Sequence, residues 1–486
     1  MTFWRKIRTP AHPKEPRSGV SKDRARRIVL RDGPAALLRM SGFGFGFLFA
    51  APLAAQQATP PPSQVEQGGL TGSVSDESEW QDLGIAIPGF ATDRDVATPA
   101  GQSAALGRQL GEVITADLRN NGLFKPTGPG SLPGIAYTDV TSPQFGIWSG
   151  RGADMLVHGY VRAGGNGQLT VGCYLYDVAL GQELARQGDV VSPSEWRRAA
   201  HKCADMVYSR LSGENPFFDS KIAYIAETGP KNKRVKRLAI MDSDGANHRF
   251  ITNGQATALT PRYSPDYKSI VYLSYVQSNP RIYVYDIGSG QQRLVTQSRN
   301  PTFAPRWSPD GRAILYAMAV GGNTDVYRVA ASGGESRRLT SDPGIDVGGS
   351  YSPDGSKIVF ESDRSGAQQC YIMDADGSNQ RRISFAGGRC ATPEWSPRGD
   401  QIAFTNASNF HVSTMSPAGG SVRELTSGWQ DEAPTWSPNG RIIQFFRTER
   451  GSGKAGLWQV DLTGRNLRRL QTPVDASDPA WGPVLP

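Results

Sequence analysis

The pattern of apolar and polar positions changes character along the chain. Between about residues 80 and 216, short strand-like runs alternate with two stretches whose apolar residues recur at helical spacing. From about residue 217 to residue 486, the strand-like runs are separated only by Gly/Pro/Asp turns, and no long helical stripe interrupts them. The pattern therefore predicts a small α/β domain at 80–216, followed by an all-β domain at 217–486.

The smaller region carries clear element signals. Residues 83–90 predict a short strand, and 155–162 with 168–178 predict a hairpin around a Gly-rich turn. Apolar residues at helical spacing between 106 and 118 predict a helix that ends near Gly122, because glycine readily adopts the left-handed conformation found after helices.

A second helix begins with a recognisable cap. Ser192 and Glu195 have the spacing of a capping box, and Pro193 occupies the expected first helical position. The apolar stripe of this helix comprises Trp196, Ala199, Cys203, Met206, Val207 and Leu211.

The larger region is a repeat. Five segments related to Pro-x-aromatic-Ser-Pro-Asp-Gly and a shorter sixth, Pro-Ala-Trp-Gly-Pro, follow one another, with their aromatic residues 44, 44, 44, 41 and 45 positions apart. A period in the low forties with strand-like content is typical of a β-propeller rather than a helical solenoid. The six aromatic positions are Tyr263, Trp307, Tyr351, Trp395, Trp436 and Trp481.

Each repeat predicts four strands. The Ser-Pro-Asp-Gly element suits a type I turn, because proline fixes φ at its second position and Asp and Gly suit the third and fourth. Three β-rich runs follow the aromatic-bearing strand in each unit, as in 314–317. The first unit, 221–252, lacks a preceding aromatic strand, whereas 479–482 supply one with no unit after it. We therefore expect the C-terminal strand to complete the first blade and close a six-bladed ring without exposed sheet edges.

Charge is distributed unevenly. Residues 1–55 hold 11 Lys/Arg and 3 Asp/Glu, so the leader carries the formal net charge of +8 and the remaining residues hold 42 of each sign. A basic nucleic-acid footprint on the folded part is therefore not supported. The basic stretch and the apolar run 40–53 predict an export signal at 1–55, cleaved near Ala55. The Pro/Gln/Gly-rich residues that follow predict a flexible linker and N-terminal segment at 56–79.

Four cysteines in an exported chain allow disulfides. Cys173 lies on the apolar face of a predicted strand and Cys203 on the helical stripe, which predicts a bridge between them, with two buried free thiols as the alternative. Cys370 and Cys390 flank one closing strand of a single blade and could pair likewise. The spacing of cysteine and histidine fits no zinc site, so we expect no metal or other cofactor.

The order of parts resembles the TolB family: a leader, a small α/β domain and a tandem array of propeller repeats. Residues 217–224 (FFDSKIAY) resemble the junction between the family's two domains. Residues 85–90 (IAIPGF) are similar to its first core strand, and 114–118 (ITADL) to the helix that follows. The resemblance covers roughly residues 80–486.

The resemblance implies a non-enzymatic periplasmic hub of the Tol-Pal system, a monomer within a multiprotein complex, whose mature form spans no membrane. Its propeller would bind the peptidoglycan-associated lipoprotein Pal. Its N-terminal segment, here the polar residues 70–79, would engage the inner-membrane protein TolA. Such a hub maintains outer-membrane integrity and supports envelope constriction during cell division.

Three other functions are compatible with a propeller. A prolyl-oligopeptidase-like hydrolase would need a G-x-S-x-G nucleophile elbow, and no such motif occurs in the sequence. A sialidase-type enzyme would need a nucleophilic tyrosine with an arginine cluster, which the sequence does not display. A periplasmic module that binds a sugar or peptide in the central channel is the remaining alternative.

Loops that enter the innermost strand of each blade gather at one mouth of a propeller channel, so we expect the Pal site there. These loops are 253–260, 298–303, 344–349, 388–392, 429–433 and 475–478. The candidate contact residues are Asn253, Gln255, Arg299, Asp346, Arg389, Trp429 and Asp431.

Overall fold

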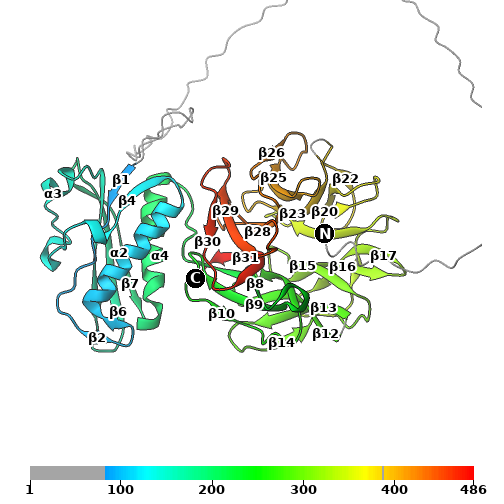
Figure 1. The fold of residues 1–486 in the computed structure, drawn as a ribbon, viewed down its shortest axis with the longest axis horizontal. Coiled ribbons are helices and arrows are strands. Elements are labelled where there is room, and N and C mark those ends of the chain that lie inside the picture. The colour runs from blue at the N-terminus through cyan, green and yellow to red at the C-terminus, as the bar shows by residue number, and fades with distance from the viewer. Residues whose placement is uncertain (1–82, 278, 386–387) are drawn as a thin grey trace, which may run out of the picture. The chain divides into compact units, whose positions relative to one another are not determined.

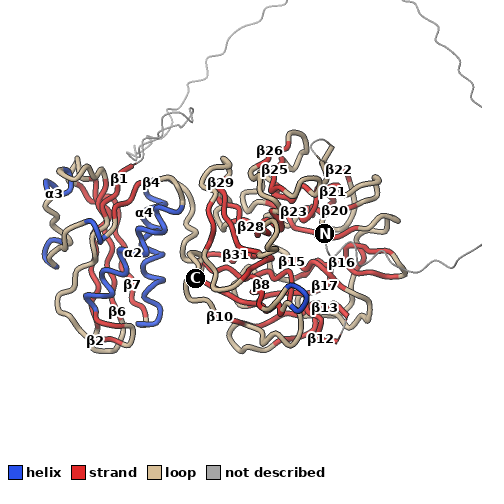
Figure 2. The backbone as a smooth tube through the Cα atoms, viewed as in Figure 1, coloured by secondary structure: helices blue, strands red, loops and turns tan. Residues whose placement is uncertain are grey.

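The structure, a computed structural model, describes residues 83–277, 279–385 and 388–486. The expected export signal and N-terminal segment lie outside these residues. Helices α2 (Ser103–Asn120), α3 (Phe145–Ser149) and α4 (Trp196–Ser212) all precede the first propeller strand (Figure 1). Beyond them, the described chain is built of strands and loops apart from one short 3₁₀ turn, Lys231–Lys233 (Figure 2).

The α/β part is a five-stranded sheet in the order β4-β1-β5-β6-β7. β1 pairs in parallel with β4 and β5, whereas β5, β6 and β7 form an antiparallel meander. Apolar side chains of α2 and α4 pack on one face of this sheet, and those around α3 belong to a separate apolar cluster. The strands are β1 (Leu83–Ala86), β4 (Phe124–Thr127), β5 (Met155–Ala163), β6 (Leu169–Asp177) and β7 (Gln182–Val191), with a small separate ribbon of β2 (Ala97–Thr98) and β3 (Gly101–Gln102).

Most predicted elements of this part are present, with two differences. β1 ends at Ala86, short of the predicted Phe90, because Pro88 has no N–H to continue a ladder. The capping box is wrong: the Ser192 hydroxyl bonds the carboxylate of Glu195 at 2.8 Å and caps no backbone N–H. Residues Pro193–Glu195 form a 3₁₀ turn, so α4 begins only at Trp196.

The predicted bridge between Cys173 and Cys203 is confirmed. It joins β6 to α4 with a Cα–Cα distance of 6.0 Å, inside the main apolar core of this part. The bond therefore crosslinks helix and sheet, which restricts the unfolded chain.

The junction between the two parts is held by a buried carboxylate. Asp205 of α4 accepts hydrogen bonds from the backbone N–H groups of Phe217, Phe218 and Asp219 at 2.7, 2.8 and 2.9 Å. The ring of Tyr208 packs edge-on against the first two of these residues. The junction is thus a structured segment with its own polar and aromatic anchors.

The larger part contains six four-stranded antiparallel sheets, as predicted. The first strands of successive sheets contact one another in a closed cycle, so they are the innermost strands of a six-bladed propeller. Blades 2 and 3 consist of β11 (Ala258–Tyr263), β12 (Ser269–Gln277), β13 (Asn279–Asp286), β14 (Gln292–Leu294), β15 (Thr302–Trp307), β16 (Ala313–Val320), β17 (Asn323–Ala330) and β18 (Arg337–Arg338). Blades 4 to 6 consist of β19 (Asp346–Tyr351), β20 (Lys357–Ser362), β21 (Gln369–Asp374), β22 (Arg381–Arg382), β23 (Cys390–Trp395), β24 (Ile402–Asn406), β25 (His411–Met415), β26 (Val422–Glu424), β27 (Asp431–Trp436), β28 (Ile442–Thr448), β29 (Ala455–Asp461) and β30 (Arg468–Leu470).

The C-terminal strand completes blade 1. β31 (Asp475–Val484) pairs antiparallel with β8 (Ser220–Thr228), and β9 (Val235–Asp242) and β10 (Arg249–Phe250) follow outward. In Figure 1 the red C-terminal strands lie beside the green β8. Closure by the end of the chain, inferred from the unmatched first and last repeats, is therefore observed.

The repeated Ser-Pro-Asp-Gly element forms the expected turn and also closes it through its serine. In blade 3, Gly311 N–H donates to the carbonyl of Ser308 at 2.9 Å, and the Ser308 hydroxyl accepts from Ala313 N–H at 2.9 Å. In blade 2 the glycine is replaced by Tyr267, which keeps the left-handed φ of 64° and stacks on Tyr263. The turn geometry is thus retained at the cost of a strained side-chain-bearing residue.

The repeat aromatics pack between blades, as predicted. Trp307, Trp395 and Trp436 each join an apolar cluster made of strands from two neighbouring blades. Two of the three also tie blades together by a hydrogen bond, because their indole N–H groups donate to the carbonyls of Arg262 and Glu394 in the preceding blade.

The second predicted bridge, Cys370–Cys390, is present, but its placement in a single blade is wrong. Cys370 lies in β21 of blade 4, whereas Cys390 begins β23, the innermost strand of blade 5. The short outer strand β22 ends at Arg382, so the chain has already entered the next blade at residue 390. The disulfide therefore links two neighbouring blades.

Candidate partner-binding face of the propeller

Antiparallel pairing gives the propeller two distinct faces. Innermost strands start at one face and end at the Ser-Pro-Asp-Gly turns of the other. We call the first the loop face. It carries the loops entering each innermost strand and the hairpins between second and third strands. The opposite surface, which we call the turn face, carries the Ser-Pro-Asp-Gly turns and the turns between third and fourth strands.

The turn face contacts the α/β part. The Asn439 amide donates to the Tyr208 hydroxyl at 3.2 Å, and the Asn466 amide donates to the carbonyl of Asn121 at 3.1 Å. Arg398 forms an ion pair with Glu214. The three propeller residues all belong to turns of blades 5 and 6, and the loop face takes no part in these contacts.

Five of the seven predicted contact residues are exposed on the loop face. They are Asn253, Gln255, Arg299, Arg389 and Trp429. The indole of Trp429 is 52% exposed, and the guanidinium of Arg450 lies 4.6 Å from its ring centroid. Such an aromatic side chain, already held in place by a cation, suits an interface anchor.

The other two predicted contact residues are not accessible, which does not fit the prediction that they contact a partner. Asp346 and Asp431 start innermost strands and are fully buried. Asp346 pairs with Arg364 at 2.7 Å, and Asp431 forms a bidentate pair with Arg447 at 2.6 and 2.8 Å. These ion pairs position the entering loops, because a buried carboxylate needs a cationic partner.

Apart from Trp429, sequence reasoning missed the apolar part of the loop face. Five of the seven exposed large apolar side chains of the described propeller residues lie there. Two of them, Val276 and Val320, stand at strand ends directly before hairpin turns, where solvent exposure is expected. Attention to these hairpins, as well as to the entering loops, would have found them. The five side chains are Val235, Val276, Val320, Phe385 and Trp429.

Each innermost strand also has a β-bulge just before its aromatic residue. The ladder slips at the same point in all six blades, and the bulged residue has a left-handed φ. A bulge redirects the following side chain. The residues directly before the aromatics form a ring of equivalent positions, one per blade, which we call the bulge ring: Arg262, Arg306, Ser350, Glu394, Thr435 and Ala480.

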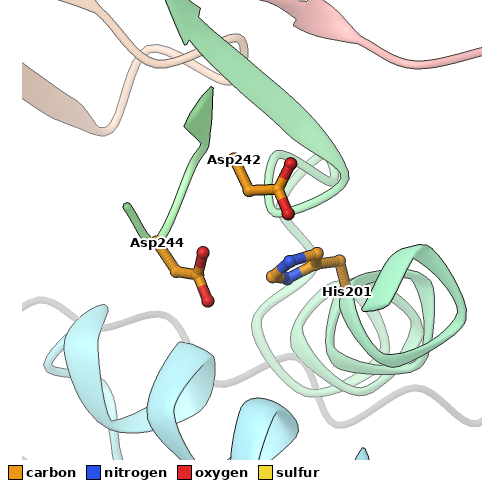
Figure 3. Close-up of side chains that lie close together, drawn as sticks. All are labelled: His201, Asp242 and Asp244. Carbon is orange, nitrogen blue, oxygen red and sulfur yellow. The ribbon is translucent and has the colours of Figure 1, made fainter. Parts of the chain in front are cut away.

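A separate polar cluster lies between α4 and the end of β9. His201, Asp242 and Asp244 each offer a ligand atom, and these atoms lie within 4.8 Å of one another (Figure 3). The carboxylates already have cationic partners, since Lys221 lies 2.6 Å from Asp242 and Arg197 pairs with both aspartates. A metal ion would have to displace these cations, so we interpret the cluster as an ion-pair network.

The imidazole of His201 is held in this network by a buried hydrogen bond. Its Nδ1 lies 2.7 Å from the carboxylate of Asp117 on α2. Burial opposes a charge on the ring, but Asp117, helped by Asp244 and Asp242, raises the pKa of His201 to about 9. At neutral pH the protonated imidazole therefore binds α2 to α4 electrostatically.

This pKa gives the protein a predicted alkaline instability. The folded-state pKa exceeds the ordinary value of 6.5, so the stabilisation is complete below about pH 6.5 and is lost as the pH rises towards 9. We expect the melting temperature to fall between pH 7 and 9, and His201→Gln to flatten that part of the profile.

His158 provides a control, because its pKa is shifted in the opposite direction to that of His201. Burial lowers its pKa to about 4, so its contribution is lost as the pH falls from about 6.5 towards 4. His158→Gln should flatten the acidic limb and leave the alkaline limb unchanged. An alkaline limb that persists in His201→Gln would contradict the assignment.

Among the described residues, no helix combines the length and apolar character needed to cross a membrane.

Comparison with known proteins gives a consistent result. The family described as "TolB beta propeller domain" matches residues 208–485, and "TolB amino-terminal domain" matches residues 76–184. Tol-Pal system protein TolB 1 of Novosphingobium aromaticivorans is 76% identical over 447 residues, which cover 91% of this chain and 99% of that protein. TolB of Zymomonas mobilis is 66% identical over 418 residues, 86% of this chain and 90% of that protein.

A solved structure agrees. The crystal structure of TolB from Acinetobacter baumannii superposes with a TM-score of 0.72 at 29% identity, and the match covers 83% of this chain and 97% of that one. The two domain matches, the high identity over most of the chain and this shared architecture lead to one conclusion. The chain belongs to the TolB family of Tol-Pal system proteins.

Proposed function

We propose that the chain is a non-enzymatic periplasmic hub that binds the lipoprotein Pal through its propeller and TolA through the segment 70–79. In this role it maintains outer-membrane integrity and supports envelope constriction during cell division. Membership of a Tol-Pal family supports a role in an envelope complex. We assign Pal to the loop face and expect no catalytic residues.

The observation that carries this assignment is the unequal use of the two propeller faces. Turn-face residues of blades 5 and 6 contact the α/β part, whereas the loop face exposes apolar side chains together with arginines. Trp429 and Phe385 are 52% and 70% exposed. Exposed aromatic residues surrounded by polar ones are characteristic of protein-binding surfaces.

Reversing two charges on the loop face tests the Pal site. Arg299→Glu with Arg389→Glu is expected to weaken Pal binding roughly tenfold to a hundredfold, because arginines at an interface contribute both charge and bidentate contacts. Both side chains are exposed, so the melting temperature should not change. Titration calorimetry with purified Pal gives the affinity, and a thermal melt gives the stability.

The matched control makes the same charge change on the turn face. Lys268→Glu with Arg312→Glu alters two exposed residues in the turns of blades 2 and 3. We expect this variant to bind Pal normally. If it loses binding while the loop-face variant keeps it, the partner surface has been assigned to the wrong face.

Deleting residues 70–79 tests the second interaction separately. Because Pal is assigned to the propeller, we expect this deletion to abolish capture of TolA while leaving the affinity for Pal unchanged. Retention of TolA binding would exclude this segment as the TolA site.

A further inference from the structure

Two arginines of neighbouring blades occupy the bulge ring. Arg262 follows the bulge of β11 in blade 2, and Arg306 follows that of β15 in blade 3. Both residues are 9% exposed, so their guanidinium groups are enclosed among the innermost strands rather than solvated at a face. Enclosing two like charges side by side is costly unless something compensates them.

One carboxylate faces both guanidinium groups. The Oε2 atom of Glu394, in blade 5, lies 3.4 Å from Nη2 of Arg262 and 3.7 Å from Nη2 of Arg306. These separations exceed the 2.7–2.9 Å of a charge-assisted hydrogen bond. The other oxygen of Glu394 is engaged elsewhere, by the Thr435 hydroxyl at 2.8 Å and the N–H of Trp436 at 3.3 Å.

The donors of the two arginines are only partly used. Nη1 of Arg262 donates to the carbonyl of Pro261, and Nη1 of Arg306 to that of Pro305. Nε of each arginine is buried and has no hydrogen-bond partner among the described residues. Nε and Nη2 form the edge through which a guanidinium group binds an oxyanion by two parallel hydrogen bonds. In both arginines this edge is therefore free of any short bond.

The acids near the two arginines leave their Nε/Nη2 edges without a short charged hydrogen bond. Two cations face one carboxylate in the ring itself, and a further acid, Asp478, acts on both arginines and accepts a hydrogen bond from Thr260 N–H at 3.4 Å. Burial, followed by repulsion from Arg262, lowers the pKa of Arg306 to about 9. Among the described residues, neither guanidinium group therefore has a carboxylate at the 2.7–2.9 Å of a charge-assisted hydrogen bond.

We propose that the propeller binds a small oxyanion of the sulfate or phosphate type between Arg262 and Arg306. The ion places its oxygens on the Nε/Nη2 edges of both arginines and neutralises their repulsion. Because the two arginines lie on different blades, a bound oxyanion also ties blades 2 and 3 together. This site is independent of the assignment of Pal to the loop face.

Titration of sulfate and of phosphate into the full-length protein by calorimetry, at constant ionic strength in chloride, tests the proposal. We expect one saturable site in the unmodified protein. Arg306→Gln is expected to weaken binding roughly tenfold to a hundredfold, because one bidentate charged contact is lost. Arg312→Gln, which removes an exposed arginine of the turn face, should leave the affinity unchanged.

A third variant distinguishes an anion site from a cation site. Glu394→Gln removes the competing carboxylate and should tighten sulfate binding about threefold or more. A cation site would behave oppositely: calcium would bind the unmodified protein, Glu394→Gln would abolish that binding, and Arg306→Gln would strengthen it. That pattern overturns the proposal, as does the absence of any binding beyond the chloride control, which would leave water alone between the arginines.

Selenate soaked into crystals of the unmodified protein provides a measurement that does not depend on variants folding. An anomalous selenium peak within hydrogen-bonding distance of Nε of both Arg262 and Arg306 is expected. A difference map with no peak there at saturating selenate would refute the site.

Discussion

Removing residues 479–486 is expected to unfold the propeller rather than merely shorten it. This deletion takes away the half of β31 that pairs Ala480 with Ala223 and Trp481 with Ile222. It therefore leaves blade 1 with only the first half of its innermost strand and opens the ring along the other half. Sheet edge becomes exposed there, because Ile222 and Ala223 of β8 lose their partners.

The deletion also removes the side-chain contacts of Trp481. The Trp481 indole N–H donates to the Ser220 hydroxyl at 2.9 Å, and its ring packs against Phe217 at the junction with the α/β part. We expect a loss of more than about 5 kcal/mol, comparable with the whole stability of an ordinary domain. Circular dichroism melts should show a broad transition at much lower temperature.

A shorter deletion provides the control. Removing only Leu485 and Pro486 leaves β31 intact and breaks two contacts, the bond from Leu485 N–H to Asp219 and that from Arg198 to the carbonyl of Pro486. The expected cost is about 1–3 kcal/mol. If the longer deletion melts within a few degrees of the full-length chain, closure by the C-terminal strand does not hold the ring together.

Closure of the ring by the C-terminal strand could be predicted because the first and last repeats are each incomplete. The first unit lacks an aromatic strand and the last aromatic strand lacks a unit, so counting alone pairs β31 with β8. The turns could also be predicted, because proline, aspartate and glycine have well-defined backbone preferences. The periodicity also predicted that the repeat aromatics pack between blades, because they recur at the same point in every blade.

Features that depend on neighbours in three dimensions could not be predicted from the sequence. The Cys370–Cys390 bridge crosses blades because β22 has only two residues and the chain reaches the next blade sooner than the repeat suggested. The left-handed bulges at Thr260, Ala304 and Thr392 carry side chains that show no preference for positive φ, so no local signal marks them.

The positions of the loops around the channel mouth could be predicted, but the accessibility of their side chains could not. The loops were assigned correctly to one mouth of the propeller, yet Asp346 and Asp431 are buried by Arg364 and Arg447. These arginines lie on the neighbouring second strand or beyond its end, 16 to 18 residues away. A polar residue in a predicted loop looks exposed until its partner is known.

Trp436→Ala is expected to destabilise the protein by about 3–5 kcal/mol, because truncation of a buried aromatic side chain leaves a cavity that the surrounding strands cannot fill. Trp436 is 4% exposed. Its ring belongs to an apolar cluster shared by blades 5 and 6, which includes Leu425 and Phe445.

Trp436 also bonds the preceding blade through two donors. Its indole N–H donates to the carbonyl of Glu394 at 3.0 Å, and its backbone N–H donates to the carboxylate of the same residue. Trp436→Phe keeps most of the buried surface and removes only the indole bond. We therefore expect this variant to lose about 1–2 kcal/mol, well below the loss in Trp436→Ala.

Trp429→Ala is the matched control, since it removes the same side chain from the loop face. Trp429 is 52% exposed and contacts a single cation, so its truncation should change the free energy of unfolding by less than about 1 kcal/mol. Denaturant titrations of all three variants, followed by far-ultraviolet circular dichroism, measure these differences. Equal losses in Trp436→Ala and Trp429→Ala would mean that the repeat aromatic does not hold neighbouring blades together. A large loss in the first and almost none in the second would show that the repeated tryptophan stabilises the ring and leave Trp429 free for recognition.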